Sequence, residues 1–403
     1  MQWYYYIAWT AIFAQLLVLY YAIRNYHYGL SKYGRKRQPV PEPLVALIIP
    51  CKGLDARFPT NIASFLKQDY ANYRVFFVVE ERTDLAYAKI CEVKEALGRE
   101  SKASDIQILV AGPSASCSQK IHNLLYALDR VPDSAQVFAF ADSDVCVHED
   151  WLSRLVWPLR LPGRGAATGY RWFVPTRNNL ASLAMSAINA GVAQLLGNSR
   201  LNHAWGGSMA ICAEDFRRLN LEQVWRSTLS DDLSLSHAVK KAGMKVIFVP
   251  GCLVPSFEDT TWSGLYEFAR RQFLITRVYV PGTWWAAFLL SLGSVAGLWG
   301  GLALAGAAAT THAEHVLLYA AVPALFFAGQ VLRAVLRQLV AVQVLSEYGP
   351  QLWRAAAADV LGCWLWSALL LLFILSSAFG QTIRWRGIRY RLDGPTQTEV
   401  LGN

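Results

Sequence analysis

Charged residues are scarce in this chain of 403 residues: Asp, Glu, Lys and Arg make up 17% of it, against 54% hydrophobic residues. Soluble domains usually carry about a quarter charged residues, so the composition argues against a wholly soluble protein and favours one that lies partly in a membrane. The net charge of +9 fits either a nucleic-acid partner or an anionic membrane surface. We expect a membrane and no nucleic acid, because basic residues directly follow the first and last apolar segments: Arg24, Lys32, Arg35, Lys36 and Arg37, then Arg384, Arg386, Arg389 and Arg391.

Paired cysteine motifs are also missing. The seven cysteines include no C-x-x-C pair, and no His stands beside them at metal-ligand spacing. This excludes a disulfide framework and a zinc site of the common spacings. We expect reduced, mostly buried thiols, as in a cytosolic domain.

The first apolar segment, 4–23, carries no charge and is long enough to cross a bilayer. A cleaved signal peptide would need a basic start and small residues at the cleavage site. Residues 1–4 are uncharged, and bulky Tyr20 and Tyr21 stand where cleavage would fall. We therefore predict a retained anchor at 1–23, with the N-terminus outside and the following basic segment on the cytoplasmic side.

After a basic, proline-containing linker at 24–43, residues 44–280 alternate between strand and helix patterns. Alternation of this kind predicts an α/β fold with a mostly parallel, Rossmann-like sheet that binds ligands at the carboxyl ends of its strands. We expect strands at 44–50, 74–79, 106–110, 137–141 and 245–249, and helices at 60–67, 85–97, 119–131, about 179–196 and after Asp232.

Residues 281–380 contain three apolar stretches, 284–309, 315–332 and 355–379, and a basic tail follows at 381–403. Three crossings after a cytoplasmic domain would leave the C-terminus outside, whereas the basic tail favours the inside. Two arrangements remain open. Either one stretch is re-entrant, or the segment around Arg337, where the apolar run continues to Leu345, crosses as well.

Two acidic pairs stand where strand or helix patterns meet loops. Asp142-Ser143-Asp144 follows the strand at 137–141, so its carboxylates suit a Mg²⁺ or Mn²⁺ ion that bridges to a diphosphate; the alternative is a simple turn or helix cap. Asp231-Asp232 precedes a helix, where acids are favoured for capping alone. A carboxylate there can also serve as general base for an acceptor hydroxyl.

The segment Trp205-Gly206-Gly207 offers glycines that allow close backbone approach to a ligand and an aromatic face for a sugar or lipid. A glycine turn beside a core Trp explains it equally well.

Six ordered segments within 44–280 carry a family resemblance. They read VALIIPCKG, FFVVEERTDLA, SQKIHNL, ADSDV, WGGSM and SDDL. Together they resemble the membrane-bound family 2 and family 21 glycosyltransferases, above all ceramide glucosyltransferases and related bacterial lipid glycosyltransferases. The resemblance implies a GT-A nucleotide-diphospho-sugar transferase domain joined to transmembrane helices.

The family pattern implies a role for each matching residue. The catalytic base would be Asp232, which deprotonates the acceptor hydroxyl. Donor contacts would come from Asp84 (with Glu80 and Glu81 as fallbacks), Lys120, Asp142 and Arg271; a Mg²⁺ or Mn²⁺ ion would bind Asp142 and Asp144; the acceptor side would include Trp205, Gly206 and Gly207.

One departure from the family concerns its (Q/R)-x-x-R-W signature. Arg271 matches the first position, but Leu274 and Ile275 replace the Arg-Trp pair. The family's Arg meets the diphosphate, so Arg270 or Arg277 would have to supply that charge. The change argues against a processive polysaccharide synthase, in which the pair lines the acceptor site.

The expected activity is therefore that of an inverting hexosyltransferase that moves a sugar from a nucleotide donor, by family inference a UDP-sugar, to a membrane lipid such as ceramide. Its catalytic domain is expected at the cytoplasmic face of an integral membrane protein, which in a bacterium is the plasma (inner) membrane. The alternatives are a processive polysaccharide synthase and a degenerate, non-catalytic relative.

Overall fold

The computed structural model describes residues 2–33 and 42–402. Two compact units share the chain. The sheet unit comprises Ser31–Phe173, Asn198–Glu258 and Gln381–Asn403, and the helical unit comprises Met1–Leu30, Val174–Gly197 and Asp259–Gly380. The basic residues Arg35, Lys36 and Arg37 and the linker residues Pro39 and Pro41 lie outside the described residues.

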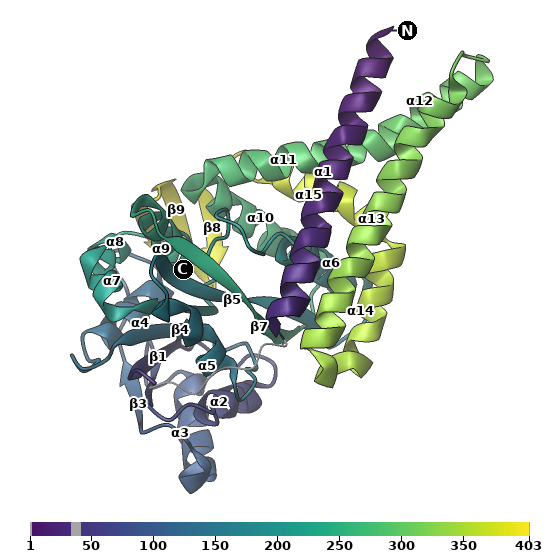
Figure 1. Ribbon diagram of the computed structural model, residues 1–403. Coiled ribbons are helices and arrows are strands. Elements are labelled where there is room, and N and C mark those ends of the chain that lie inside the picture. The colour runs from purple at the N-terminus through teal and green to yellow at the C-terminus, as the bar shows by residue number, and fades with distance from the viewer. Residues whose placement is uncertain (1, 34–41, 403) are drawn as a thin grey trace. The chain divides into compact units, whose positions relative to one another are not determined.

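A seven-stranded sheet of order β3-β2-β1-β4-β6-β5-β7 forms the centre of the sheet unit (Figure 1). Strands β3, β2, β1 and β4 are parallel, and β6 runs antiparallel to both β4 and β5. The predicted α/β class is confirmed. The strands are β1 (Val45–Pro50), β2 (Tyr73–Val79), β3 (Asp105–Val110), β4 (Val137–Ala141), β5 (Arg164–Pro175), β6 (Ser208–Cys212) and β7 (Lys245–Glu258).

Helices cover both faces of this sheet. Successive side chains on a strand point to opposite faces, so each strand contributes to two separate hydrophobic cores. On β1, Leu47 and Ile49 pack in one core with α2, α3 and α5, whereas Ile48 packs in a second core with α4, α7, α8 and α9. These helices are α2 (Phe58–Leu66), α3 (Leu85–Leu97), α4 (Gln119–Leu128), α5 (Trp151–Val156), α7 (Ala213–Arg218), α8 (Leu221–Trp225) and α9 (Asp231–Lys241), with short turns η1 (Gly98–Glu100) and η2 (Trp157–Arg160).

Two parts of the sheet unit extend beyond the sequence prediction. Strand β7 does not end near residue 249 but continues to Glu258. The basic tail folds as an antiparallel sheet of order β10-β9-β8, with β8 (Thr382–Trp385), β9 (Ile388–Gly394) and β10 (Gln397–Gly402). The tail therefore belongs to the same compact unit as the main sheet.

The helical unit contains three helices long and apolar enough to cross a membrane within the described residues: Tyr4–Tyr33, Pro281–Thr310 and Val316–Val344. The second is continuous through a π-helical turn, and the third continues through Arg333 and Arg337 instead of ending before them. The unit's elements are α1 (Gln2–Tyr33), α6 (Leu180–Ala193), α10 (Trp262–Tyr279), α11 (Pro281–Val295), η3 (Ala296–Gly300), α12 (Gly301–Thr310), α13 (Val316–Val344), η4 (Ser346–Tyr348), α14 (Gly349–Leu361) and α15 (Cys363–Ser376).

Glycines let the long helices approach closely. A Cβ at Gly329 of α13 would lie 2.0 Å from the Gln15 amide nitrogen of α1, and one at Gly297 would lie 2.5 Å from the Phe326 ring. Small residues at such crossings are typical of membrane helices. Figure 1 shows α12 and α13 joined as a helical hairpin.

The third apolar stretch predicted from sequence is not one straight helix. The chain bends by 83° between Ser346–Leu361 and Cys363–Ser376, at Gly362. A buried ion pair holds α14 to α13: the Arg337 guanidinium contacts the Asp359 carboxylate, which also accepts a hydrogen bond from Gln338 at 2.7 Å. A pair bent in this way is either a broken span or a re-entrant segment, so both topologies stay open.

Candidate functional site

Lys120 links two of the acidic segments. The Ser118 hydroxyl caps α4 by accepting from the Ile121 N–H, which places Lys120 in the first turn. Its Nζ atom lies 2.8 Å from Asp142 Oδ1, just after β4, and 3.2 Å from Asp231 Oδ2, at the start of α9. The side chains of Lys120 and Asp231 are only 14% and 4% exposed, so these ion pairs are largely shielded from solvent.

Burial and charge act in opposition on this trio. Burial alone would lower the pKa of Lys120, but Asp142, Asp231 and Asp232 together raise it, so the ammonium stays charged. Lys120 holds the pKa of Asp142 below its usual range in spite of burial. Burial raises the pKa of Asp231 to about 6, with help from the charges of Asp232 and Asp142 and against that of Lys120.

The two glycines of the Trp-Gly-Gly segment lie against these groups. The Gly206 N–H donates to Asp232 Oδ2 at 3.0 Å. A Cβ at Gly206 would lie 2.5 Å from Asp231 Oδ2 and 2.7 Å from Lys120 Nζ, and one at Gly207 would lie 2.7 Å from Asp142 Oδ2. A side chain at either position would collide with the charged groups, so close backbone approach requires glycine here.

Asp232 is held in one orientation by three donors. Its Oδ1 accepts from the Ser230 hydroxyl at 2.5 Å and from the Leu233 N–H at 2.7 Å, and its Oδ2 accepts from the Gly206 N–H.

Trp205 is 8% exposed, and its main-chain N–H donates to the Thr168 hydroxyl at 2.9 Å. The fold therefore brings together Lys120, the Trp-Gly-Gly segment and three of the predicted acidic residues, Asp142, Asp231 and Asp232. They come from four separate segments of the chain.

A second acidic cluster surrounds Asp144. Its Oδ2 lies 4.0 Å from the Arg171 guanidinium, and its Oδ1 is buried without a hydrogen-bond partner. The negative charge of Glu258, the last residue of β7, acts to raise the pKa of Asp144. The pKa of Asp144 is raised to about 7. Burial is the main cause, the negative charge of Asp142 raises the pKa further, and the positive charge of Arg171 opposes the rise. Asp55, in the loop after β1, adds a further negative charge.

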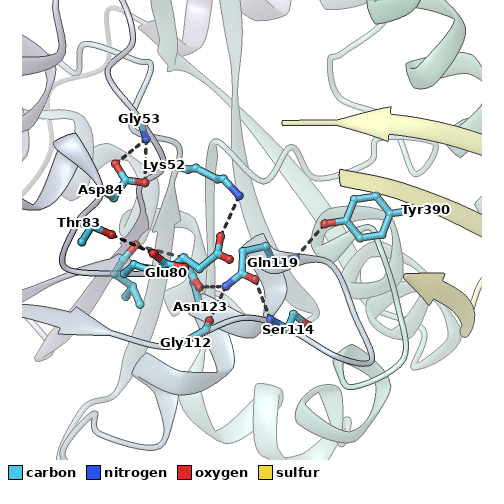
Figure 2. Close-up of polar contacts among 12 residues, drawn as sticks. Lys52, Gly53, Glu80, Thr83, Asp84, Gly112, Ser114, Gln119, Asn123 and Tyr390 are labelled. Carbon is cyan, nitrogen blue, oxygen red and sulfur yellow. Dashed lines mark hydrogen bonds and ion pairs between the residues drawn. The ribbon is translucent and has the colours of Figure 1, made fainter. Parts of the chain in front are cut away.

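Asp84 lies at the same edge of the sheet but makes a different set of contacts (Figure 2). It follows β2, caps α3 by accepting from the Ala86 N–H, and accepts from the Gly53 N–H at 2.9 Å. In the sheet order β1 separates β2 from β4, so about 10 Å divides the two strand ends. Of the fallback residues, Glu80 pairs with Lys52 at 2.8 Å, and Glu81 accepts from the Thr83 hydroxyl.

Arg271 and its neighbours belong to α10 of the helical unit. The Arg271 guanidinium lies over the Phe268 ring, 5.5 Å from its centroid. Arg270 donates to the Ser376 and Phe379 carbonyls, and Arg277 donates to those of Ala378 and Gly380. The latter two arginines thus satisfy main-chain carbonyls at and beyond the end of α15.

Sequence reasoning missed four charged residues of the second cluster. Arg171 lies on β5, a strand that was not predicted, and Glu258 lies on the part of β7 beyond the predicted end. Asp55 stands a few residues after the predicted strand at 44–50. Its position near the carboxyl end of that strand was the only indication in the sequence that it belongs to the site. Arg386, in the turn between β8 and β9, comes from a tail that was expected to be only a basic extension.

The donor atoms near Asp144 fit a hard divalent cation. Within residues 2–33 and 42–402, no group of three or more His, Cys, Asp or Glu side chains is arranged to hold a metal ion by itself. Mg²⁺ usually binds one or two carboxylates together with substrate phosphates, so such a group is not required. The buried, unpartnered Oδ1 of Asp144 is a suitable ligand atom.

The chain matches the family model for glycosyl transferase family 21 over residues 5–397. No curated protein matches it. Among solved structures it is similar to mannosyltransferase PcManGT from Pyrobaculum calidifontis in complex with GDP-Man and Mn²⁺, with a TM-score of 0.45, 14% identity and coverage of 92% of this chain and 97% of that one. It is also similar to glucosyl-3-phosphoglycerate synthase from Mycobacterium tuberculosis in complex with phosphoglyceric acid, with a TM-score of 0.36, 15% identity and coverage of 58% and 78%.

Because the match spans nearly the whole chain, the protein belongs to glycosyl transferase family 21. Its sheet unit has the α/β fold with a mostly parallel sheet that the sequence predicted. The predicted enzyme class, a hexosyltransferase that uses a nucleotide sugar, is confirmed with the family.

Proposed function

We propose that this enzyme transfers a hexose from a nucleotide sugar, specifically a UDP-sugar, to the hydroxyl of a membrane lipid such as ceramide, with inversion at the anomeric carbon. The observation that carries the proposal is the convergence of Lys120, Asp142, Asp231 and Asp232 on the Gly206–Gly207 backbone. This charged centre lies in a chain that also carries three helices able to cross a membrane.

Each residue has a role that its contacts support. Asp232, oriented by the Ser230 hydroxyl and the Gly206 N–H, takes the proton of the acceptor hydroxyl as general base. Lys120 stays charged beside Asp142 and contacts the donor. Asp84, which joins the loops after β1 and β2, holds the base or ribose of the nucleotide. Trp205 lies on the acceptor side.

A divalent cation, Mg²⁺ or Mn²⁺, would be held by Asp144 and Asp142. Asp142 already pairs with Lys120, whereas Asp144 has a buried oxygen without a partner, so Asp144 is the stronger candidate ligand. When bound, the cation would neutralise charge on the leaving nucleoside diphosphate.

The position of the C-terminal tail constrains the topology. Tyr390 and Pro395 of the tail accept hydrogen bonds from Gln119 and Thr228, so the tail and the GT-A domain lie on the same side of the membrane. An even number of crossings must then separate residues 258 and 381. Pro281–Thr310 and Val316–Val344 would supply two, and we infer that the pair α14 and α15, bent by 83°, is re-entrant and does not add a third. Basic residues near both ends support the cytoplasm as that side.

Single cysteines introduced at exposed positions in otherwise cysteine-free protein test this topology. Thr382→Cys in the tail and Asp133→Cys in the GT-A domain should both resist a membrane-impermeant maleimide in sealed, right-side-out vesicles and react after permeabilisation. Labelling of only one of them before permeabilisation would refute the arrangement.

The proposed reaction is tested by incubating purified protein with radiolabelled nucleotide sugars and total membrane lipid, and identifying labelled lipid by mass. Asp232→Asn should reduce transfer by about two to four orders of magnitude, the usual contribution of general-base catalysis. Asp133→Asn, an exposed residue of the same domain, is the matched control and should retain full activity. Undiminished transfer by Asp232→Asn would disprove the assigned base.

The same assay separates the two alternatives. A lipid that carries a single sugar supports a single-transfer enzyme, whereas a ladder of polymer lengths indicates a processive synthase. A non-catalytic relative would label no product with any donor.

A further inference from the structure

The turn between β8 and β9 holds Arg386 in an uncommon conformation. Arg386 and Gly387 form a two-residue connection, with φ angles of 49° and 87°. Positive φ at both positions defines the tight type I′ hairpin turn, which is unfavourable for a long side chain such as Arg. A residue kept in such a conformation indicates a constraint beyond the turn itself.

The hairpin is attached to segments that carry the site. The Tyr390 hydroxyl, 2% exposed, accepts from the Gln119 N–H at 3.4 Å, next to Lys120 (Figure 2). The Thr228 hydroxyl donates to the Pro395 carbonyl at 3.0 Å, close before the acidic pair that starts α9. Leu392 is fully buried. The tail is therefore an integral part of the GT-A domain.

This attachment brings Arg386 to the acidic cluster from the far end of the chain. Its Nη2 atom lies 2.7 Å from Asp55 Oδ1. Burial would lower its pKa, but the charges of Asp55, Asp144 and Glu258 together raise it. The side chain is 46% exposed, whereas those of Lys120 and Arg171 are 14% exposed. Of these three cations, Arg386 is the most accessible to a ligand.

Charge balance shows why an accessible cation matters at this point. Three cations lie among six carboxyl groups, and burial raises the pKa of three of these carboxyls, Asp144, Asp231 and Glu258, so an accessible cation here adds to the positive charge that an incoming diphosphate meets. The family signature that would supply an Arg has Leu274 in its place, and Arg270 and Arg277 donate to main-chain carbonyls. The acids are Asp55, Asp142, Asp144, Asp231, Asp232 and Glu258, and the cations are Lys120, Arg171 and Arg386.

We propose that Arg386 of the C-terminal hairpin is a diphosphate-binding residue that contacts the nucleoside diphosphate of the donor in place of the missing signature arginine. This proposal rests on the proposed function, because it requires a nucleotide-sugar donor. A guanidinium presents five N–H donors in a planar fork that matches phosphate oxygens. Asp55 accepts a hydrogen bond from one nitrogen of that fork at 2.7 Å, and the Arg386 side chain is 46% exposed.

The test measures binding of UDP, GDP, uridine and guanosine by calorimetry, with Mg²⁺ present, to full-length protein in detergent. Arg386→Ala should weaken binding of the preferred nucleoside diphosphate about ten- to a hundredfold, the usual loss for a charge-assisted hydrogen bond. The affinity for the nucleoside should stay within about twofold of the wild-type value. Arg389→Ala, an exposed arginine of the same hairpin, is the matched control and should change neither. Arg386→Lys should recover part of the loss, because it restores charge without the fork.

Each other outcome has a defined meaning. If Arg386→Ala weakens binding of the nucleoside diphosphate and of the nucleoside equally, or weakens neither, Arg386 does not contact the diphosphate. The proposal for Arg386 is then wrong, whereas the proposed function stands. If the wild-type protein binds no nucleoside diphosphate, both proposals fail.

Discussion

Replacing Lys120 by Met tests the electrostatic centre of the site. The change keeps the length of the side chain but removes the charge that Asp142 and Asp231 share at 2.8 and 3.2 Å. Two shielded carboxylates would then lie near each other without a cation. The pKa of Asp231, which is about 6 with Lys120 in place, should rise because Lys120 holds it down, and this favours uptake of a proton by Asp231.

The size of the effect follows from this proton uptake. Breaking a buried ion pair usually costs about 3–5 kcal/mol, because an uncompensated charge remains. Protonation of Asp231 relieves part of that cost, so we expect a loss of about 2–3 kcal/mol at pH 7. The folded variant binds a proton that the unfolded chain releases, so its stability falls further as pH rises. For a domain of this size, the melting temperature should fall by about 4–12 °C.

The assay is thermal unfolding in detergent at pH 6 and pH 8. Lys241→Met, an exposed lysine of the same unit, should leave the melting temperature unchanged. Asp231→Asn added to Lys120→Met should restore most of the stability, because it removes one of the two like charges. A loss that is independent of pH, or that Asp231→Asn does not relieve, would refute the electrostatic account of Lys120.

Three further predictions follow from the structure. Gly206→Ala should lower the initial rate of transfer at least tenfold, because its Cβ would lie 2.5 Å from a carboxylate oxygen, whereas Gly282→Ala, with open space around its Cβ, should not. Asp359→Asn should destabilise the helical unit by about 3–5 kcal/mol in detergent melts, since it leaves the buried Arg337 unpaired, and unchanged melting would contradict that pairing. Burial and Lys240 lower the pKa of His203 to about 4, so stability should fall as pH drops from 6.5 toward 4, and His203→Asn should flatten that dependence in melts across this range.

The parallel half of the sheet was predictable because its strands are short apolar runs buried on both faces. The segments 44–50 and 137–141 became β1 and β4 almost to the residue. The antiparallel half was not predictable in the same way. Strand β5 contains Arg164, Gly169 and Arg171, which interrupt any apolar run, and tertiary packing decides its conformation.

The acidic residues of the site were easier to predict from the sequence than the basic residues that pair with them. Asp142 follows a predicted strand and Asp231 precedes a predicted helix, so the pattern locates both at element boundaries, but only the family resemblance assigns them to one site. Their cations are harder to assign, because a pairing depends on which segments tertiary structure brings together. Lys120 was found through family order, whereas Arg386 pairs with Asp55 across most of the chain and no local pattern connects the two.

The chemistry proposed for Arg386 and the topology of the helical unit depend on each other. Under the proposed topology, a hairpin at the end of the chain can reach the site only if the preceding helices return the chain to the side of the membrane on which the site lies. As a re-entrant segment, the pair bent at Gly362 would meet that requirement, because a helix that crossed here would add a third crossing and carry the tail to the opposite side. A Cβ at Gly362 would lie 2.6 Å from the Trp366 indole, so the bend itself depends on glycine. Under this reasoning the loss of the signature arginine and the re-entrant end of the helical unit have one explanation: the positive charge for the donor comes from the C-terminal hairpin.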